Sequence, residues 1–155
     1  MKAKAMRLER TDLLGLEDLP AREIMLILDS AKAMKEHVSG AHTCFPSLNG
    51  KIVLNLFYEA STRTRTSFEL AGKRLGASVV NFSFSVSSMS KGETLKDTVL
   101  NLQAMSPHLM VVRHPVPGVA KLIADTVPAS VINAGDGSHE HPSQALLDLF
   151  TIREE

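Results

Sequence analysis

KIVLNLFYEASTRTRTSFELAGKRLG, residues 51–76, decides the fold class, because it places a strand, a polar loop and a helix in direct succession. Lys51–Tyr58 is a nearly continuous apolar run, which predicts a strand buried on both faces. Thr64–Leu75 has apolar residues three and four positions apart, which predicts an amphipathic helix, and Gly76 supplies its stop signal. A fully buried strand followed at once by a helix is typical of a parallel α/β sheet.

The rest of the chain repeats this alternation of short apolar strands and amphipathic helices. After a polar lead-in over residues 1–18, we predict helices over 20–38, 64–75, 94–105, 118–127 and from 142 to the end, and strands over 51–58, 78–84, 109–113 and 130–134. The pattern predicts an α/β fold with a four-stranded parallel sheet and helices on both faces. Ligands of such sheets lie beyond the carboxyl ends of the strands, here in loops 58–65, 85–93, 113–117 and 134–142.

Composition limits the classes of partner. The chain has 155 residues, the size of one domain, and a formal net charge of zero. Nucleic-acid and membrane-surface binders are normally basic overall, so we expect neither as a partner and predict only local anion sites. Cys44 is the only cysteine, so no internal disulfide can form, and no apolar run approaches the roughly 20 residues of a membrane span. We therefore predict a cytoplasmic protein.

The loop after the first strand contains an unusual concentration of hydroxyls and arginines, Ser61-Thr62-Arg63-Thr64-Arg65. A helix start carries free backbone N–H groups and partial positive charge, which disfavours cations there by roughly 0.3–1 kcal/mol each. Two arginines in this position are explained by a bound phosphate, which amides, hydroxyls and a guanidinium fork all fit. The alternative is a capped helix whose arginines are solvated or paired, for example Arg65 with Glu69.

Two further cations follow later strands, and each has a functional and a structural interpretation. The serine-rich loop Ser87–Glu93 is either a solvated surface loop or a mobile arm that delivers Lys91 to an anion. Arg113 follows the third strand and either points into the ligand crevice or forms a structural ion pair. The residues alone favour the solvated surface loop for Ser87–Glu93 and leave both alternatives open for Arg113.

The fourth loop ends in His139-Glu140-His141-Pro142. Proline is favoured as the first residue of a helix, which makes His141 the N-cap. The positive helix end then keeps the imidazole neutral and able to donate a hydrogen bond, which suits polarising a carbonyl. A metal site is the alternative, but the spacing matches no recognised zinc pattern and we predict no metal.

Four stretches in this order resemble the carbamoyltransferases: residues 57–69, Ser87 to Asp97, Arg113-His114-Pro115, and residues 135–144 with His141-Pro142-Ser143-Gln144. The aspartate branch of the family is more similar than the ornithine branch. Glu59 precedes the Ser-Thr-Arg-Thr-Arg segment as in the aspartate type, and Ser143 stands where the ornithine type usually has cysteine. The resemblance covers residues from about 8 to the end and implies the aspartate/ornithine carbamoyltransferase domain fold.

The resemblance also implies roles for individual residues. Ser61, Thr62, Arg63 and Thr64 are expected to hold the phosphate, and Thr64, Arg113 and His141 the carbonyl oxygen of carbamoyl phosphate. Gln144 is expected to orient the carbamoyl amino group, while Ser87 and Lys91 reach a neighbouring subunit's site. Arg65 and Glu59 are expected to be structural or to take part in domain closure. The implied catalytic set is Arg63, Thr64, Lys91, Arg113 and His141, with no cofactor.

The implied reaction transfers the carbamoyl group of carbamoyl phosphate to L-aspartate, giving N-carbamoyl-L-aspartate and phosphate in de novo pyrimidine biosynthesis. Residues 1–155 correspond to the carbamoyl-phosphate-binding domain, and the C-terminal aspartate-binding domain is absent, so we expect no turnover by this chain alone. The implied assembly is a homotrimer with shared active sites. The resemblance also allows a larger complex with regulatory or dihydroorotase-like chains. Alternatives are an ornithine-type enzyme, a non-catalytic structural paralogue in a pyrimidine-pathway complex, and a phosphate-sensing module.

Overall fold

A computed structural model describes residues 7–39, 45–83 and 94–155 and contains one parallel sheet. Its strands are β1 (Ile52–Phe57), β2 (Ser78–Ser83), β3 (Leu109–His114) and β4 (Ser130–Asp136), in the order β2-β1-β3-β4. The helices are α1 (Ala21–Ser39), α2 (Thr62–Arg74), α4 (Leu95–Gln103), α5 (Val119–Ala124) and α6 (Pro142–Glu154). The predicted α/β class and parallel sheet are confirmed.

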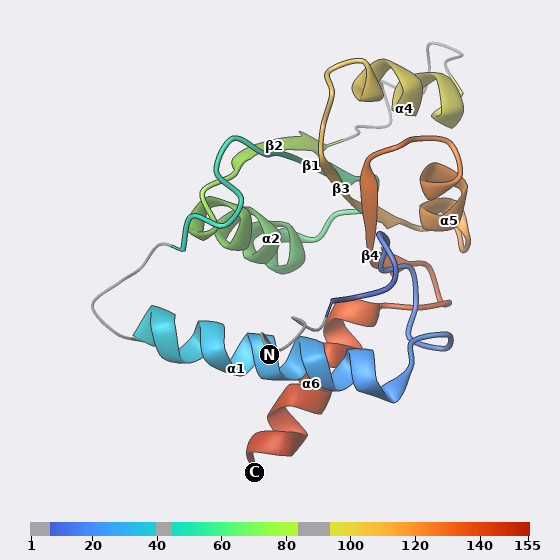
Figure 1. Ribbon diagram of the computed structural model, residues 1–155. Coiled ribbons are helices and arrows are strands. Elements are labelled where there is room, and N and C mark those ends of the chain that lie inside the picture. Colours follow the sequence, from blue (N-terminus) through green and yellow to red (C-terminus); the bar gives the residue numbers. More distant parts are fainter. Residues whose placement is uncertain (1–6, 40–44, 84–93) are drawn as a thin grey trace.

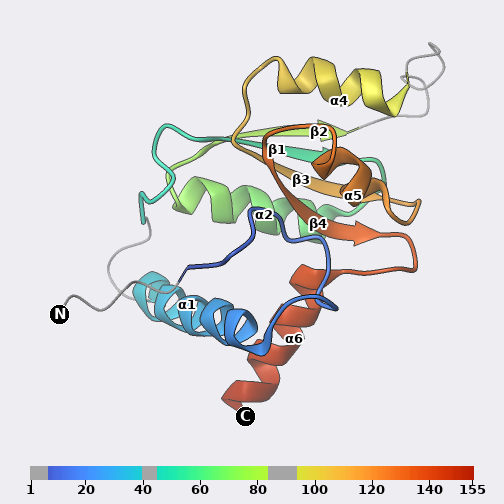
Figure 2. The same cartoon turned by 45° about the vertical axis from the view of Figure 1, so that its right-hand side comes forward.

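The two faces of the sheet carry different helices, as the views in Figures 1 and 2 show. The chain passes from β1 to the edge strand β2 through α2. It then returns in the opposite direction, from β2 to β3 through α4 and from β3 to β4 through α5. Right-handed crossovers in opposite directions must lie on opposite faces. The direction changes between β1 and β3, and such a switch point is where parallel sheets bind ligands.

Alternation along β1 divides the apolar core into two clusters. Leu54 and Leu56 face α4 and α5 and pack with Val99 and Val119, which are also buried. Val53 and Phe57 face the other way, toward α2, in a smaller cluster that includes Phe68. The continuous apolar run of β1 is therefore explained by burial on both faces.

Several boundaries differ from the sequence prediction. α2 begins at Thr62, two residues earlier than predicted, and its N-cap is Ser61. β4 extends two residues beyond the predicted end and includes Asp136. α5 is shorter than predicted and ends at Ala124, although its last turn continues to Val127 through hydrogen bonds to Ile123. Loop 85–93 lies outside the described residues.

The N-terminal segment is more than a lead-in, because part of it runs beside β4. Leu13 forms a parallel bridge with Ile132. The N–H of Leu13 donates to the Val131 carbonyl and the Leu13 carbonyl accepts from the Asn133 N–H, both at 2.8 Å. At the other end, α6 is tied to α1 by ion pairs of Arg153 with Asp29 and of Lys35 with Glu154. None of the helices in these described segments is long and apolar enough to cross a membrane.

α2 lies unusually close to the edge strand β2. Gly72 is buried in the last turn of the helix, and a Cβ atom there would stand 2.6 Å from Cγ2 of Val79. Glycine normally weakens a helix interior by up to about 1 kcal/mol relative to alanine. Its presence at this position is therefore explained by the close approach of helix and strand.

We predict that Gly72→Ala lowers the free energy of unfolding, although alanine is the better helix former. Overpacking against the stiff, β-branched Val79 costs about 1–3 kcal/mol, which outweighs the gain in helix propensity. Urea unfolding of the variant measures the net effect. The double variant Gly72→Ala/Val79→Ala removes the clash and is expected to recover stability relative to Val79→Ala alone; no recovery would contradict the packing argument.

Candidate functional site

The start of α2 is a helix end whose donors are not satisfied by a side-chain cap. Ser61 is the N-cap but makes no side-chain capping hydrogen bond, and the first turn contains no acidic residue. The first intrahelical bond runs from the Arg65 N–H to the Ser61 carbonyl at 3.1 Å. The amides of Thr62, Arg63 and Thr64 precede that bond, so they are available to an anion.

Arg113 approaches from the end of β3 and is held at two points. Its Nη2 donates to Oε1 of Glu59 at 2.9 Å, and its Nη1 donates to the Ala134 carbonyl at 3.1 Å. The side chain is only 20% exposed. The structural ion pair that the sequence left open is therefore present, and the same contacts orient the guanidinium into the crevice.

His141 is the N-cap of α6, as predicted. Its Nδ1 accepts a hydrogen bond from the Gln144 N–H and lies 3.2 Å from Oγ of Ser143. A neutral ring that accepts at Nδ1 carries its proton on Nε2, which can therefore donate. Burial, and then the charge of Arg113, lower the pKa of His141. The predicted neutral donor is thus supported, with burial and Arg113 adding to the helix-end argument.

Gly135 allows these two side chains to approach each other. A Cβ atom at this position would stand 2.8 Å from Nη1 of Arg113 and 3.2 Å from Cδ2 of His141. The residue also has φ of +116°, a conformation that other residues rarely adopt. The end of β4 therefore requires glycine at this position for two independent reasons.

One cavity of about 690 Å³ brings most of the predicted site residues together. Its polar lining consists of Ser61, Arg63, Thr64, Ser67, Arg113, His141, Ser143 and Gln144. No carboxylate is among its described lining residues, and Glu59, which pairs with Arg113, lies outside that lining. In the described part of the chain, Arg63 has no ion-pair partner. Glu69 forms a close ion pair with Lys73, and the charge of Arg65 also contributes to lowering the pKa of Glu69.

Not every predicted residue lines this cavity. Thr62 lies in an adjoining cavity of about 300 Å³ together with Glu59 and Arg65, and Ser61 lines both. Ser87 and Lys91 lie outside the described residues. In the described segments, no group of three or more His, Cys, Asp and Glu residues is arranged to hold a metal ion.

Comparison with known proteins identifies the family. Residues 11–154 match the family described as aspartate/ornithine carbamoyltransferase, carbamoyl-P binding domain. The chain belongs to this family. Over 143 residues it is 59% identical to the aspartate carbamoyltransferase catalytic subunit of Pelotomaculum thermopropionicum, covering 92% of this chain and 46% of that protein. The carbamoyltransferase resemblance stated from residues 57–69 is confirmed, and this relative bears the name of the predicted aspartate branch.

Solved structures agree with this assignment. The catalytic subunit of M. jannaschii aspartate transcarbamoylase is 42% identical with a TM-score of 0.86, covering 94% of this chain and 47% of that one. The Trypanosoma cruzi aspartate transcarbamoylase in complex with carbamoyl phosphate and aspartate is 38% identical with a TM-score of 0.85, covering 93% and 44%. The chain therefore spans about half the length of the carbamoyltransferases that it matches.

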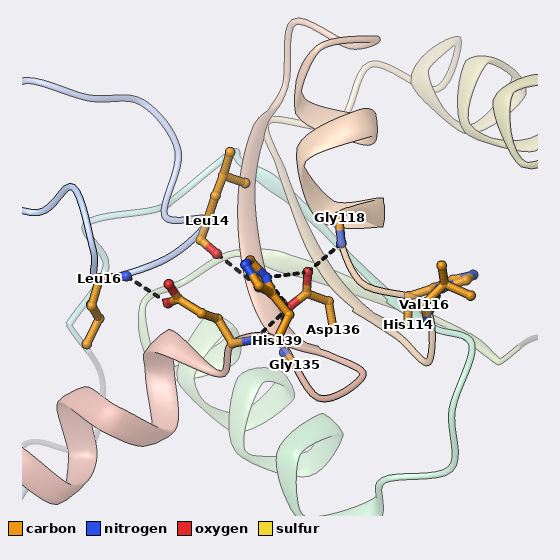
Figure 3. Close-up of polar contacts among 10 residues, drawn as sticks. Leu14, Leu16, His114, Val116, Gly118, Gly135, Asp136 and His139 are labelled. Atoms are coloured by element: carbon orange, nitrogen blue, oxygen red, sulfur yellow. Dashed lines mark hydrogen bonds and ion pairs between the residues drawn. The ribbon is translucent and has the colours of Figure 1, made fainter.

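Asp136 organises the loops of this carbamoyltransferase domain, and sequence reasoning did not single it out. The residue is 2% exposed. Its carboxylate accepts from the N–H groups of Gly118 (2.8 Å) and Glu140 (3.1 Å) and from Nδ2 of Asn133 (3.0 Å), and it lies 3.2 Å from Nδ1 of His139. Figure 3 shows the carboxylate of Asp136 between Gly118, at the start of α5, and His139, in the loop after β4.

The same loop is tied to the N-terminal segment. Oε2 of Glu140 accepts the Leu16 N–H at 2.8 Å, and Nδ2 of Asn133 also donates to the Leu14 carbonyl at 2.9 Å (Figure 3). These contacts fix β4 before Gly135 and the loop after β4, and they thereby help to position His141. A sequence signal was present, since Asp136 stands between two glycines, but such a pattern normally indicates only a turn.

Asp136 is expected to contribute stability that depends on pH. Burial alone would raise the pKa of its carboxyl, but hydrogen bonds from Asn133, Gly118, Glu140 and His139 together lower it. A lowered native pKa gives stabilisation that is complete above the unfolded-state pKa of about 3.9 and is lost as pH falls through the native value.

We predict that Asp136→Asn lowers the free energy of unfolding by about 2 kcal/mol or more at pH 7, because several hydrogen bonds to a buried charge are lost. The difference from wild type shrinks below about pH 4. Urea unfolding at both pH values tests this. The exposed Asp125, paired only with Lys121 four residues earlier, gives the control Asp125→Asn, for which little change is expected. A constant difference at all pH values would contradict the role of the ionised carboxylate.

We also predict that His141 is the Nε2–H tautomer at neutral pH and that its pKa lies below the ordinary value of about 6.5. Nitrogen-15 NMR of the imidazole measures both quantities. Arg113→Ala removes one cause of the lowering and should raise the pKa of His141 toward the ordinary value. An Nδ1–H tautomer, or a pKa unaffected by Arg113→Ala, would be inconsistent with the geometry.

Proposed function

We propose that this chain binds carbamoyl phosphate in the cavity between α2 and α6, as the carbamoyl-phosphate-binding half of an aspartate carbamoyltransferase. The single observation that carries the proposal is the composition of that cavity. Two guanidinium groups, Arg63 and Arg113, and the donors of the α2 start line it, with no carboxylate among its described lining residues. Such a surface favours an anion with several oxygens.

A second cavity makes the contrast clear. The cavity of about 430 Å³ between the N-terminal segment and α5 is lined by several acidic residues, among them Asp12, Glu17 and Asp125. A phosphate would be repelled there. The charge distribution therefore favours the strand-end cavity for the anion, and the free amides at the start of α2 support the same choice.

The two ends of the ligand have different partners in this proposal. The phosphate lies against Ser61, Arg63 and Thr64 at the start of α2, with Thr62 beside it. The carbonyl oxygen lies toward Arg113 and Nε2–H of His141, with Thr64 as a third donor. Negative charge grows on this oxygen as an amine attacks the carbamoyl carbon, and preorganised donors stabilise that charge. Phosphate then leaves with its charge balanced by Arg63 and the helix start.

Gln144 is suited to orient the carbamoyl amino group. Its side-chain nitrogen Nε2 donates a hydrogen bond to Oδ1 of Asp148 at 2.9 Å. That bond fixes which end of the side-chain amide faces the cavity, so the oxygen is presented as an acceptor. A carbamoyl NH₂ group is a donor, whereas a carboxylate or phosphate oxygen at the same place would be repelled.

The acceptor, assembly and location belong to the same proposal. L-Aspartate is the proposed acceptor, because the relatives described above are aspartate carbamoyltransferases. The remaining half of those relatives is where we place aspartate binding, so this chain alone is expected to lack turnover. Ser87 and Lys91 are proposed to complete a neighbouring site in a cytoplasmic homotrimer of the pyrimidine pathway.

We predict that Arg63→Ala weakens binding of carbamoyl phosphate, and of inorganic phosphate, by about 10- to 100-fold, because one charge-assisted hydrogen-bonding partner is lost. Calorimetric titration measures the dissociation constants. Arg65→Ala is the matched control: it removes the same charge two residues along the helix but from the adjoining cavity, so a much smaller change is expected. Equal dissociation constants for wild type and Arg63→Ala would overturn the proposed site.

A further inference from the structure

A buried polar residue interrupts the apolar face of β1 beneath α2. Asn55 is completely buried and lies between Val53 and Phe57, which belong to the apolar cluster on this side of the sheet. Its Oδ1 has no hydrogen-bond partner among the described residues. An apolar side chain would avoid that penalty, so the presence of asparagine calls for an explanation in terms of the bond that it does make.

That bond begins a chain of side-chain hydrogen bonds that ends on α2. Nδ2 of Asn55 donates to Oδ1 of Asn81 on β2 at 2.8 Å, and Nδ2 of Asn81 donates to Oε2 of Glu69 at 2.8 Å. Oε1 of Glu69 accepts from Lys73 at 2.5 Å. Hydrogen bonds from Lys73 and Asn81 lower the pKa of Glu69, so the group is an ionised acceptor. Because a carboxylate can only accept, it fixes the orientation of both amides.

The attachment to β2 acts on the same helix that forms the anion site. Glu69 directly follows Phe68, a lining residue of the strand-end cavity, and Gly72 lies three residues further on, against Val79. Residues three apart share a helix face. One face of α2 therefore makes two contacts with β2, a hydrogen bond at Glu69 and close packing at Gly72. Together they fix the rotation of α2 about its axis and its position along β2. Figure 2 shows α2 running along this part of the sheet.

We propose that Glu69 and Asn81 are positioning residues for the anion site: their hydrogen bond sets α2 so that its first-turn amides, Arg63 and Thr64 face Arg113 and His141 across the cavity. The inference rests on the proposed function, because it assumes that this cavity binds the phosphate. A helix is a stiff rod with a rise of about 1.5 Å per residue, so a shift at Glu69 is carried to the first turn roughly 10 Å away. Misplacement of a binding group by about 1 Å can reduce its contribution about 100-fold.

Charge alone predicts the opposite outcome for the central variant. Removing the negative charge of Glu69 would strengthen binding of an anion at the start of the same helix. Loss of positioning would weaken it. Asn81→Ala changes no charge. It leaves Nδ2 of the buried Asn55 without this partner, so its thermal midpoint is measured alongside phosphate binding.

The test measures inorganic phosphate binding by calorimetry at constant ionic strength, with each variant well below its own thermal midpoint. We expect Asn81→Ala and Glu69→Ala to raise the dissociation constant about tenfold. Glu69→Gln keeps an acceptor for Asn81 and is expected to bind phosphate at least as tightly as wild type. Lys73→Gln, which leaves the Glu69–Asn81 bond intact, is the matched control and should change the dissociation constant less than about twofold, since exposed charges are screened.

Amide NMR gives a second measurement that needs no ligand. Asn81→Ala is expected to shift the amide resonances of Thr62, Arg63 and Thr64, whereas Lys73→Gln should leave them in place. A lowered thermal midpoint with an unchanged dissociation constant would mean that the bond only stabilises the fold and would overturn the inference.

The two proposals fail in distinguishable ways. If wild type binds phosphate and Arg63→Ala does not, but Asn81→Ala binds like wild type, the positioning role is wrong and the site stands. If Arg63→Ala binds phosphate as well as wild type does, or wild type does not bind it, the proposed function is wrong and the positioning role falls with it.

Discussion

Positive charge concentrated at one edge of the parallel sheet is the constraint on which the site depends. The amides that open α2 and the guanidinium groups of Arg63 and Arg113 point into one cavity, and none of its described lining residues is acidic. Assembling such a group costs free energy in the absence of an anion, because like charges repel. The fold meets that cost with contacts behind the site: Glu59 holds Arg113 from one side, and the Ala134 carbonyl holds it from the other.

The surroundings of the cavity consist of polar networks that fix loops and helices. Asp136 gathers donors from α5, β4 and the following loop, while Glu140 and Asn133 secure the N-terminal segment. On the other side, Glu69 and Asn81 connect α2 to the sheet. The groups that face the cavity are therefore supported by residues that do not face it. This arrangement suits a site whose donors must be preorganised and not induced by the ligand.

Most of the fold could be predicted from the sequence because its signals are local. The buried run of β1, the helical spacing after Thr64 and the glycine stops each depend on a few neighbouring residues. The site could be placed for the same reason, since polar residues at strand ends can occupy only one edge of a parallel sheet. His141 as an N-cap followed directly from Pro142.

What the sequence did not indicate depends on contacts between distant residues. The pairing of Leu13 with β4, the hub at Asp136 and the link from Asn55 to Glu69 join segments that are many positions apart or whose residue types normally indicate turns and surfaces. Thr62 lines the adjoining cavity and not the main one, because the N-cap is Ser61 and Thr62 is therefore already a helical residue. One residue of difference in a helix start changes the direction of a side chain by about 100°.

Gly135 limits how the end of β4 can be altered. Any side chain at this position would have to displace Arg113 or His141 and would adopt an unfavourable backbone conformation as well. Efforts to redesign the cavity for another anion must therefore leave this residue unchanged, because any side chain added here would push the two donors apart.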